Sequence, residues 1–265
     1  MPKTSNRYVQ LIEAIFNRFY REGATEIPFE RSDINRAADE LGIKLPKNLG
    51  DVLYSFRYRV SLPASIVDKA QEGYAWIIRP AGRAHYKLVL VKQAVITPSN
   101  VLVETKIPDA TPGIIAKYPM NDEQALLAKI RYNRLIDIFT GITCYSLQNH
   151  LRTTVPNIGQ VEIDEIYIGI DKRGAHYILP VQAKGKFDNI GVVQIEQDLA
   201  VCANKFSSLI CRSIAAQSMD NDVIALFEFE STIEGVKVVS EKHYRLVKPT
   251  DLTMDELESY RGRPF

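Results

Sequence analysis

Four polar side chains interrupt two otherwise apolar segments in the second half of the chain. Glu162 and Asp164 lie in the first segment, and Gln182 and Lys184 lie in the second. A purely structural strand would carry Val or Ile at such positions, because a buried polar group needs compensation. A carboxylate, an amide oxygen and an ammonium around one point can hold a hard divalent cation beside an attacking water. These residue types point to metal-assisted hydrolysis of a phosphodiester, in which Lys184 could orient or help deprotonate the nucleophile.

The residues between the two segments predict how the segments pair. Asp171-Lys172-Arg173-Gly174 is typical of a three-residue hairpin loop with glycine in the left-handed third position. Asp171 should then lie opposite Ala175, and directly paired residues share a face of the sheet. This register places two pairs on one face: Asp164 with Gln182, and Glu162 with Lys184.

The two segments resemble the PD-(D/E)xK nuclease superfamily, which includes many restriction endonucleases built on a mixed sheet with flanking helices. The resemblance rests on Val161-Glu162-Ile163-Asp164-Glu165-Ile166-Tyr167 and on Leu179-Pro180-Val181-Gln182-Ala183-Lys184. The second segment is similar to the Q-x-K variant of the Mrr-type restriction enzymes. By this resemblance Asp164 ligates the metal, Gln182 takes the position usually held by a second acid, and Lys184 is the catalytic lysine. Two features depart from the pattern: no proline precedes Asp164, and the second acid is neutral.

The metal site implied by this resemblance needs more negative charge than Asp164 supplies. Because Gln182 is neutral, a further carboxylate is expected near a bound Mg²⁺. Glu162 is the first candidate, since it shares the face of Asp164, and Glu123 on the preceding helix is the second. The predicted metal ligands are therefore Asp164, Gln182 and Glu162. Glu165 should point to the opposite face of a regular strand.

The elements predicted around these segments form an α/β domain. Apolar residues recur at gaps of three and four from Val192 to Phe206, which predicts a helix with one core-facing stripe. Asn121 and Gln124 have the spacing of a capping box for a helix that continues to Phe139. The remaining elements are a short helix over 146–153 and strands over 160–170, 175–184, 208–215, 223–229 and 236–246.

The first half of the chain predicts a short succession of helices and strands. Helical periodicity covers residues 6–21, Ser32 can cap a second helix, and Pro46 suits the first turn of a third. Strands are expected over 26–29, 74–78 and 85–91. This order, over about residues 1–95, resembles the winged-helix family of DNA-binding domains, in which the third helix enters the major groove.

Polar residues on that third helix and near the predicted site could contact DNA. Lysine and arginine neutralise phosphates or bond guanine, asparagine can bond adenine, and aspartate can accept from cytosine. The predicted contacts are Lys47, Asn48, Asp51, Arg57 and Arg59, with Arg152 and Lys186 nearer the site. An exposed helix is polar in any case, and winged helices also bind proteins, so a protein-binding module is the alternative.

Composition and charge exclude several classes of protein. With 46% hydrophobic and 25% charged residues over 265 positions, the chain is neither disordered nor collagenous, and no apolar run is long enough to span a bilayer. Cys144, Cys202 and Cys211 form no CxxC pair, which suits a reducing cytoplasm and argues against a structural zinc. Residues 1–120 carry 17 Lys and Arg against 12 Asp and Glu, whereas residues 121–265 carry 16 against 20. A basic first half fits a polyanionic partner, and an acidic second half could hold carboxylates for a metal.

Prolines and a glycine between Ile107 and Pro119 predict a linker between two domains. We expect a winged helix over 1–107 and a restriction-endonuclease-like mixed sheet flanked by helices over 120–265. The expected function is that of a cytoplasmic, Mg²⁺-dependent endonuclease, a type II or modification-dependent restriction enzyme that hydrolyses double-stranded DNA. A homodimer is expected, because two strands must be cut. The alternatives are a winged-helix regulator with a non-catalytic C-terminal sensor domain, an RNA- or structure-specific nuclease, and, for the hairpin itself, an exposed face paired by Glu162 and Lys184.

Overall fold

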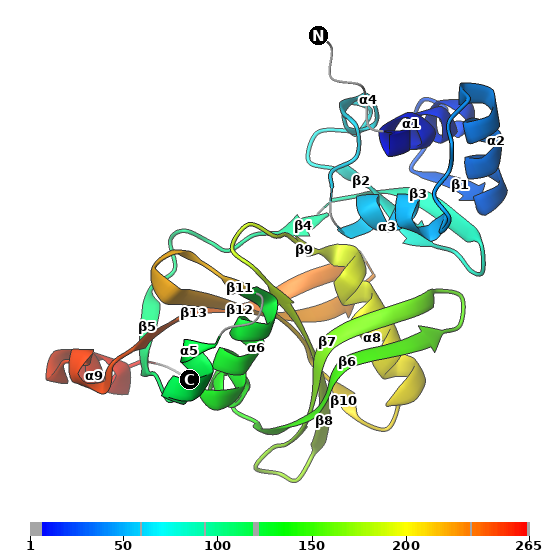
Figure 1. Ribbon diagram of the computed structural model, residues 1–265. Coiled ribbons are helices and arrows are strands. Elements are labelled where there is room, and N and C mark those ends of the chain that lie inside the picture. The colour runs from blue at the N-terminus through cyan, green and yellow to red at the C-terminus, as the bar shows by residue number, and fades with distance from the viewer. Residues whose placement is uncertain (1–6, 59, 93, 119–121, 234, 264–265) are drawn as a thin grey trace. The chain divides into compact units, whose positions relative to one another are not determined.

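The computed structural model describes residues 7–58, 60–92, 94–118, 122–233 and 235–263. The chain divides into two compact units (Figure 1). The first comprises Met1–Ile96, Thr153–Val161 and Gly191–Gln197, and the second comprises Thr97–Arg152, Glu162–Ile190 and Asp198–Phe265. The N-terminal segment of the first unit thus ends at residue 96, whereas the predicted domain boundary lies at residue 107. The proline-rich segment contributes β5 (Glu104–Pro108) and α5 (Gly113–Lys117) to the second unit.

The first unit combines short helices with a three-stranded antiparallel sheet of order β1-β3-β2. Its elements before residue 97 are α1 (Arg7–Phe19), β1 (Glu26–Glu30), α2 (Arg31–Leu41), α3 (Gly50–Tyr58), α4 (Ala64–Val67), β2 (Ala75–Pro80), β3 (His85–Val91) and β4 (Val95–Ile96). Apolar residues at helical spacing build its core, among them Leu11 and Phe16 of α1 and Leu53 of α3. The three helices and three strands predicted for this part of the chain are therefore present.

Two helix starts in the first unit differ from the prediction. The N-cap of α2 is Glu30 rather than Ser32. Helix α3 begins at Gly50 and not at Pro46. Asn48 Oδ1 accepts a hydrogen bond from the Gly50 N–H at 3.1 Å, a local turn that leads into the helix.

The chain from β5 onward contributes an eight-stranded mixed sheet and the helices beside it, an α/β arrangement. The main path of the sheet has the order β5-β13-β12-β11-β8-β7-β6, and β10 pairs with β8. None of the helices in the described ranges is long and apolar enough to cross a membrane. The elements are α6 (Asp122–Tyr132), α7 (Leu135–Thr140), β6 (Thr143–Val155), β7 (Gly159–Ile170), β8 (His176–Lys184), β9 (Ile190–Gly191), α8 (Val192–Lys205), β10 (Ile210–Cys211), β11 (Ser213–Ser218), η1 (Asp220–Asp222), β12 (Val223–Thr232), β13 (Gly235–Val247), η2 (Pro249–Asp251) and α9 (Met254–Arg261).

Helices flank this sheet at β8. Leu126 and Ile130 of α6 share one hydrophobic core with Val181 of β8. Side chains alternate along a strand, so Gln182 points to the opposite face, where its Nε2 donates a hydrogen bond to Asp198 of α8. A mixed sheet flanked by helices is the α/β architecture that the sequence predicts.

The pairing of β7 with β8 has the predicted register from Glu165 to the turn, and the predicted pairs of Asp164 with Gln182 and of Glu162 with Lys184 lie beyond the end of this ladder. The ladder runs from Glu165 opposite Val181 to the turn that joins the two strands. At the turn, the Asp171 N–H donates to the Ala175 carbonyl at 3.1 Å. Gly174 has a φ of 81°, which is the left-handed conformation expected of the third loop residue. The turn residues therefore set which residues of the two strands lie opposite one another.

Two helix predictions for the second half are wrong. Residues 146–153 belong to β6, an edge strand beside β7, and the β-branched residues near its end favour a strand. The helix expected to reach Phe139 is divided into α6 and α7 at Arg134, whose φ of 50° is left-handed. Asn121, the predicted cap of that helix, lies outside the described residues.

Candidate active site

Asp164 lies near the end of the ladder that joins β7 and β8. Its Oδ2 accepts a hydrogen bond from the Ala183 N–H at 2.8 Å. A side-chain oxygen thus takes the role that a backbone carbonyl of a neighbouring strand would have. This bond holds the Asp164 carboxylate against β8, beside the backbone that carries Gln182 and Lys184.

Lys184 is the cation of this cluster. Its Nζ lies 3.4 Å from Oε1 of Glu123, and the lysine side chain is only 13% exposed. Glu123 lies in the first turn of α6, where the helix dipole favours a carboxylate. We call Asp164, Gln182, Lys184 and Glu123 the site cluster.

Gln182 is buried and bonded to a carboxylate of α8 that the sequence reasoning missed. Gln182 Nε2 donates to Oδ1 of Asp198 at 2.9 Å, and Asp198 is 0% exposed. The core-facing stripe that the sequence predicts runs through Ile195 and Leu199. Asp198 follows Ile195 by three residues, so the two side chains lie on the same face of the helix. An acid on this core-facing side was the sequence signal that could have identified Asp198.

Burial dominates the electrostatics of the cluster. Desolvation raises the pKa of Asp164 above its ordinary value, although the Ala183 N–H and Lys184 oppose this shift, and Glu123 adds to it. Desolvation raises the pKa of Asp198 well above its ordinary value, and the nearby Asp164 carboxylate adds to that shift. A cation bound near these groups would stabilise their charged forms, so the cluster is arranged to gain from cation binding.

Glu162, the first candidate for an additional metal ligand, has its carboxylate engaged by residues of β6. Oε2 of Glu162 lies 3.1 Å from Nε of Arg152, and Oε1 lies 3.6 Å from Nδ1 of His150. Lys184 pairs with Glu123. The alternative of a purely structural hairpin face predicted that Lys184 would pair with Glu162. The geometry therefore favours Glu123, the second candidate, as the additional carboxylate.

Glu165 points to the opposite face of β7, as predicted. It is 0% exposed, and its Oε1 accepts hydrogen bonds from Nε of Arg131 at 2.9 Å and from the Ser146 hydroxyl. Arg131 belongs to α6, so this carboxylate lies on the side of the sheet that α6 covers. Glu165 is thus separated by the sheet from the face that carries Asp164 and Gln182.

The predicted DNA contacts on and before α3 are partly engaged in local structure. Asn48 Oδ1 accepts from the Gly50 N–H, and its Nδ2 donates to Oδ1 of Asp51 at 2.8 Å. The Arg57 guanidinium lies 4.8 Å from the centre of a neighbouring tyrosine ring. Lys47 and Asp51 are exposed, whereas Arg59 lies outside the described residues. Lys47, Asn48 and Asp51 are therefore the exposed predicted contacts, and Asn48 and Asp51 are bonded to each other.

The two predicted phosphate contacts nearer the site cluster both form ion pairs. Arg152 pairs with Glu162, as described above. Lys186 pairs with Asp220, and its Nζ lies 5.0 Å from the centre of the Phe187 ring. Binding of DNA by either residue would have to compete with these contacts.

The donors of the site cluster fit a hard divalent cation. Asp164, Glu123 and the amide oxygen of Gln182 are all oxygen donors, which Mg²⁺ prefers. Within the described ranges, no group of three or more His, Cys, Asp or Glu side chains is arranged to hold a metal ion. A cation at this cluster would therefore depend on the amide oxygen and on waters in addition to the two carboxylates.

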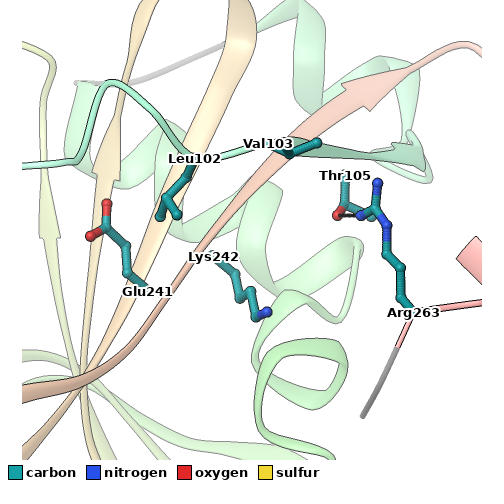
Figure 2. Close-up of a pocket in the computed structure, with 6 residues that line it drawn as sticks. All are labelled: Leu102, Val103, Thr105, Glu241, Lys242 and Arg263. Atoms are coloured by element: carbon teal, nitrogen blue, oxygen red, sulfur yellow. Dashed lines mark hydrogen bonds between the residues drawn. The ribbon is translucent and has the colours of Figure 1, made fainter.

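A pocket of about 330 Å³ lies on other strands of the sheet (Figure 2). It involves β5 and β13, and β5 is the edge strand at the opposite end of the sheet order from β6. The Glu241 carboxylate in its lining already accepts a hydrogen bond from the Ser99 N–H at 2.8 Å and lies 2.8 Å from Nε2 of His243. The pocket includes no member of the site cluster, and its lining is Leu102, Val103, Thr105, Glu241, Lys242 and Arg263.

The chemistry of the site cluster is thus the strongest indication of what the protein does. Comparisons with family models, with curated proteins and with solved structures gave no match to this chain.

Proposed function

We propose that the protein is a Mg²⁺-dependent DNA endonuclease of the PD-(D/E)xK type, either a type II or a modification-dependent restriction enzyme. The observation that carries this proposal is the bond from the Ala183 N–H to Asp164 at 2.8 Å, which brings the acid next to the Q-x-K segment. An acid, an amide and a partly buried ammonium at one strand end have the residue types of a hydrolytic site. The mixed sheet, with α6 before the segment and α8 after it, also supports the assignment.

Asp164, Glu123 and the Gln182 amide oxygen would hold the cation. When bound, Mg²⁺ would supply a water of lowered pKa and would stabilise negative charge on the phosphate. Asp164 would bind the ion with its position already set by the Ala183 N–H. Asp164 is half-buried, so its attraction to a cation is screened less than it would be at a fully exposed position.

Lys184 would place a positive charge beside the attacking water and the scissile phosphate. The contact with Glu123 at 3.4 Å restricts the ammonium to the site cluster. An ammonium held in this way can orient the nucleophile and stabilise charge that develops on phosphate oxygens. Lys184 is therefore assigned as the catalytic lysine.

The first unit would select the DNA. The element order α1, β1, α2, α3, α4, β2, β3, with a β1-β3-β2 sheet, supports a winged helix in which α3 enters the major groove of double-stranded DNA and the one-turn α4 is an addition. Exposed Lys47 and Asp51 precede or begin that helix and are suited to phosphate and base contacts. A homodimer would provide the two sites that cutting both strands requires.

Digestion of a supercoiled plasmid with Mg²⁺ tests the proposal. The wild-type chain should nick or linearise methylated or unmethylated plasmid. Lys184→Ala should lower the rate by on the order of 10²–10³-fold, while a gel-shift assay shows unchanged DNA binding. Lys172→Ala is the matched control, because Lys172 is exposed in the turn at the other end of the same strand pair. It should cut at the wild-type rate.

The other outcomes of this digestion are equally informative. Undiminished cutting by Lys184→Ala would contradict the role of the lysine. Intact methylated and unmethylated plasmids after incubation with the wild-type chain would contradict DNA cleavage, and binding without cutting would favour a DNA-binding regulator. Cleavage restricted to RNA or to branched or single-stranded DNA would keep the chemistry and change the substrate.

A further inference from the structure

Gln182 can bind a cation through only one of its two terminal atoms. The oxygen of an amide is an acceptor, whereas the nitrogen carries two hydrogens and acts as a donor. A carboxylate in the same place would present an oxygen in either orientation. An amide that serves as a ligand therefore needs neighbours that hold it in one orientation.

Two acceptors face the nitrogen of the Gln182 amide. Nε2 donates to Oδ1 of Asp198 at 2.9 Å and, more weakly, to the Glu162 carbonyl at 3.4 Å. A backbone carbonyl oxygen is always an acceptor, so the NH₂ group and not the oxygen must face these two atoms. The oxygen of Gln182 consequently points away from both of them.

Asp198 is an unfavourable residue for the core of α8. It is 0% exposed, and in the described part of the chain its Oδ2 has no hydrogen-bond partner. Ile195 and Val201 of the same helix are fully buried apolar residues, and Gln197 is a second buried polar residue, with 5% exposure. A buried carboxyl with an unpaired oxygen costs stability, and a leucine would avoid that cost. An unfavourable residue in contact with a site residue indicates a role in the site.

We propose that Asp198 is a positioning residue that holds the Gln182 amide with its oxygen toward the cation site. This inference rests on the proposed function of the site cluster and adds to it a residue of α8. Asp198 acts through Gln182 and need not touch the ion. Its contribution is to make a neutral amide behave as a ligand of fixed orientation.

Calorimetric titration of the full chain with Mg²⁺ alone tests the proposal without reference to cleavage. Asp198→Leu removes the acceptor and should weaken Mg²⁺ binding about 10–100-fold, the usual effect of losing a residue that orients a metal ligand. Asp198→Asn also removes the carboxylate, but its oxygen can still accept from Gln182, so it should retain most of the wild-type affinity. Cys202→Ala, at another buried position of α8, is the control for general loosening of the helix and should bind Mg²⁺ normally.

A second background separates positioning from support of the fold. Gln182→Glu gives this position two oxygens, so the orientation of the side chain no longer matters. In that background Asp198→Leu should not weaken Mg²⁺ binding, because the glutamate needs no partner to orient it. The substitution also removes the Asp198 carboxylate, which would repel the carboxylate introduced at position 182. A purely structural role for Asp198 would instead weaken binding equally in both backgrounds.

The outcomes distinguish this inference from the nuclease proposal. Wild-type Mg²⁺ affinity in Asp198→Leu, or an equal loss in both backgrounds, would overturn the positioning role even if the wild-type chain cuts DNA. The expected binding pattern without any DNA cleavage would support positioning and contradict the nuclease. A wild-type chain that binds no Mg²⁺ at millimolar concentration would contradict both. Thermal melts establish that each variant is folded, and Asp198→Ala provides the same comparison if leucine does not fit the core.

Discussion

The two ends of the β7–β8 pair carry aspartates in opposite electrostatic conditions. At the turn, Asp171 accepts hydrogen bonds from the Arg173 N–H at 2.8 Å, the Ala175 N–H at 3.0 Å and the Tyr177 hydroxyl at 3.0 Å. Desolvation raises the pKa of Asp171, but hydrogen bonds from Arg173, Ala175 and Tyr177 outweigh it and hold the pKa far below its ordinary value. At the other end, desolvation outweighs the favourable contacts and raises the pKa of Asp164.

This difference separates a stabilising end of the hairpin from a candidate functional end. The Asp171 carboxylate has donors that stabilise its charge, so the turn favours the folded state at neutral pH. Asp164 and Asp198 are disfavoured in their charged forms, and they lie beside Lys184 and Gln182. Carboxylates whose charged forms are disfavoured by burial are typical of sites that bind a cation or perform chemistry.

Removal of the Asp164 charge should have the largest effect. Asp164→Asn should reduce Mg²⁺-dependent cleavage by on the order of 10²–10³-fold. The same change should raise the free energy of unfolding at pH 7 by roughly 0.5–2 kcal/mol, because an amide oxygen can still accept from Ala183 without a desolvated charge. Plasmid digestion and urea unfolding measure the two effects.

The stability gain of Asp164→Asn should depend on pH. The pKa of Asp164 is raised on folding, so this residue lowers the free energy of unfolding of the wild-type protein as pH rises from the unfolded pKa of about 4 through the folded pKa. The advantage of the variant should therefore be present at pH 7 and disappear below about pH 4. A variant that is less stable than the wild type at pH 7 would contradict the comparison between the two ends.

The turn end of β7 should tolerate no added side chain at Gly169. A Cβ at Gly169 would lie 2.6 Å from Cγ2 of Ile142, 3.1 Å from Sγ of Cys144 and 3.3 Å from Cδ1 of Leu179. Gly169→Ala should therefore lower the free energy of unfolding by about 1–3 kcal/mol, measured with urea. Gly113→Ala is the control, since a Cβ there meets nothing within 4 Å. Equal losses from the two variants would show that packing around β7 is not the cause.

Neutralisation of the turn should have the smallest effect, of opposite sign to that at Asp164. Asp171→Asn should lower the melting temperature at pH 7, because it replaces a carboxylate that accepts several hydrogen bonds. The pKa of Asp171 is lowered on folding, so its contribution is present above the unfolded pKa of about 4 and is lost as pH falls toward the folded value. Melting curves from pH 7 to pH 2 measure this trend. A difference that grows as pH falls would contradict it.

The sequence predicted the register of β7 and β8 between the turn and Glu165 because local residues determine it. Asp171 and Gly174 specify the hairpin turn, and the turn fixes which residues of β7 and β8 are opposite. Because side chains alternate along a strand, Asp164 and Glu165 lie on opposite faces of the sheet, as the structure confirms. These features depend on interactions between residues close in sequence.

Features that depend on distant residues were not predicted. The choice between Glu162 and Glu123 depends on Arg152, which lies in a segment expected to be helical and is found in β6. The contact of Asp198 with Gln182 depends on how α8 packs against the sheet, which helical periodicity does not specify to within one residue. Strand pairing and helix rotation are tertiary properties, so local patterns could not decide them.

We propose that the Asp164 end of the β7–β8 pair cleaves DNA with the help of Mg²⁺. The most direct test is a time course of supercoiled plasmid with the wild-type chain and Lys184→Ala, each in Mg²⁺ and in EDTA. We predict nicked or linear product only for the wild-type chain in Mg²⁺. Cutting that persists in EDTA, or equally in Lys184→Ala, would contradict the claim.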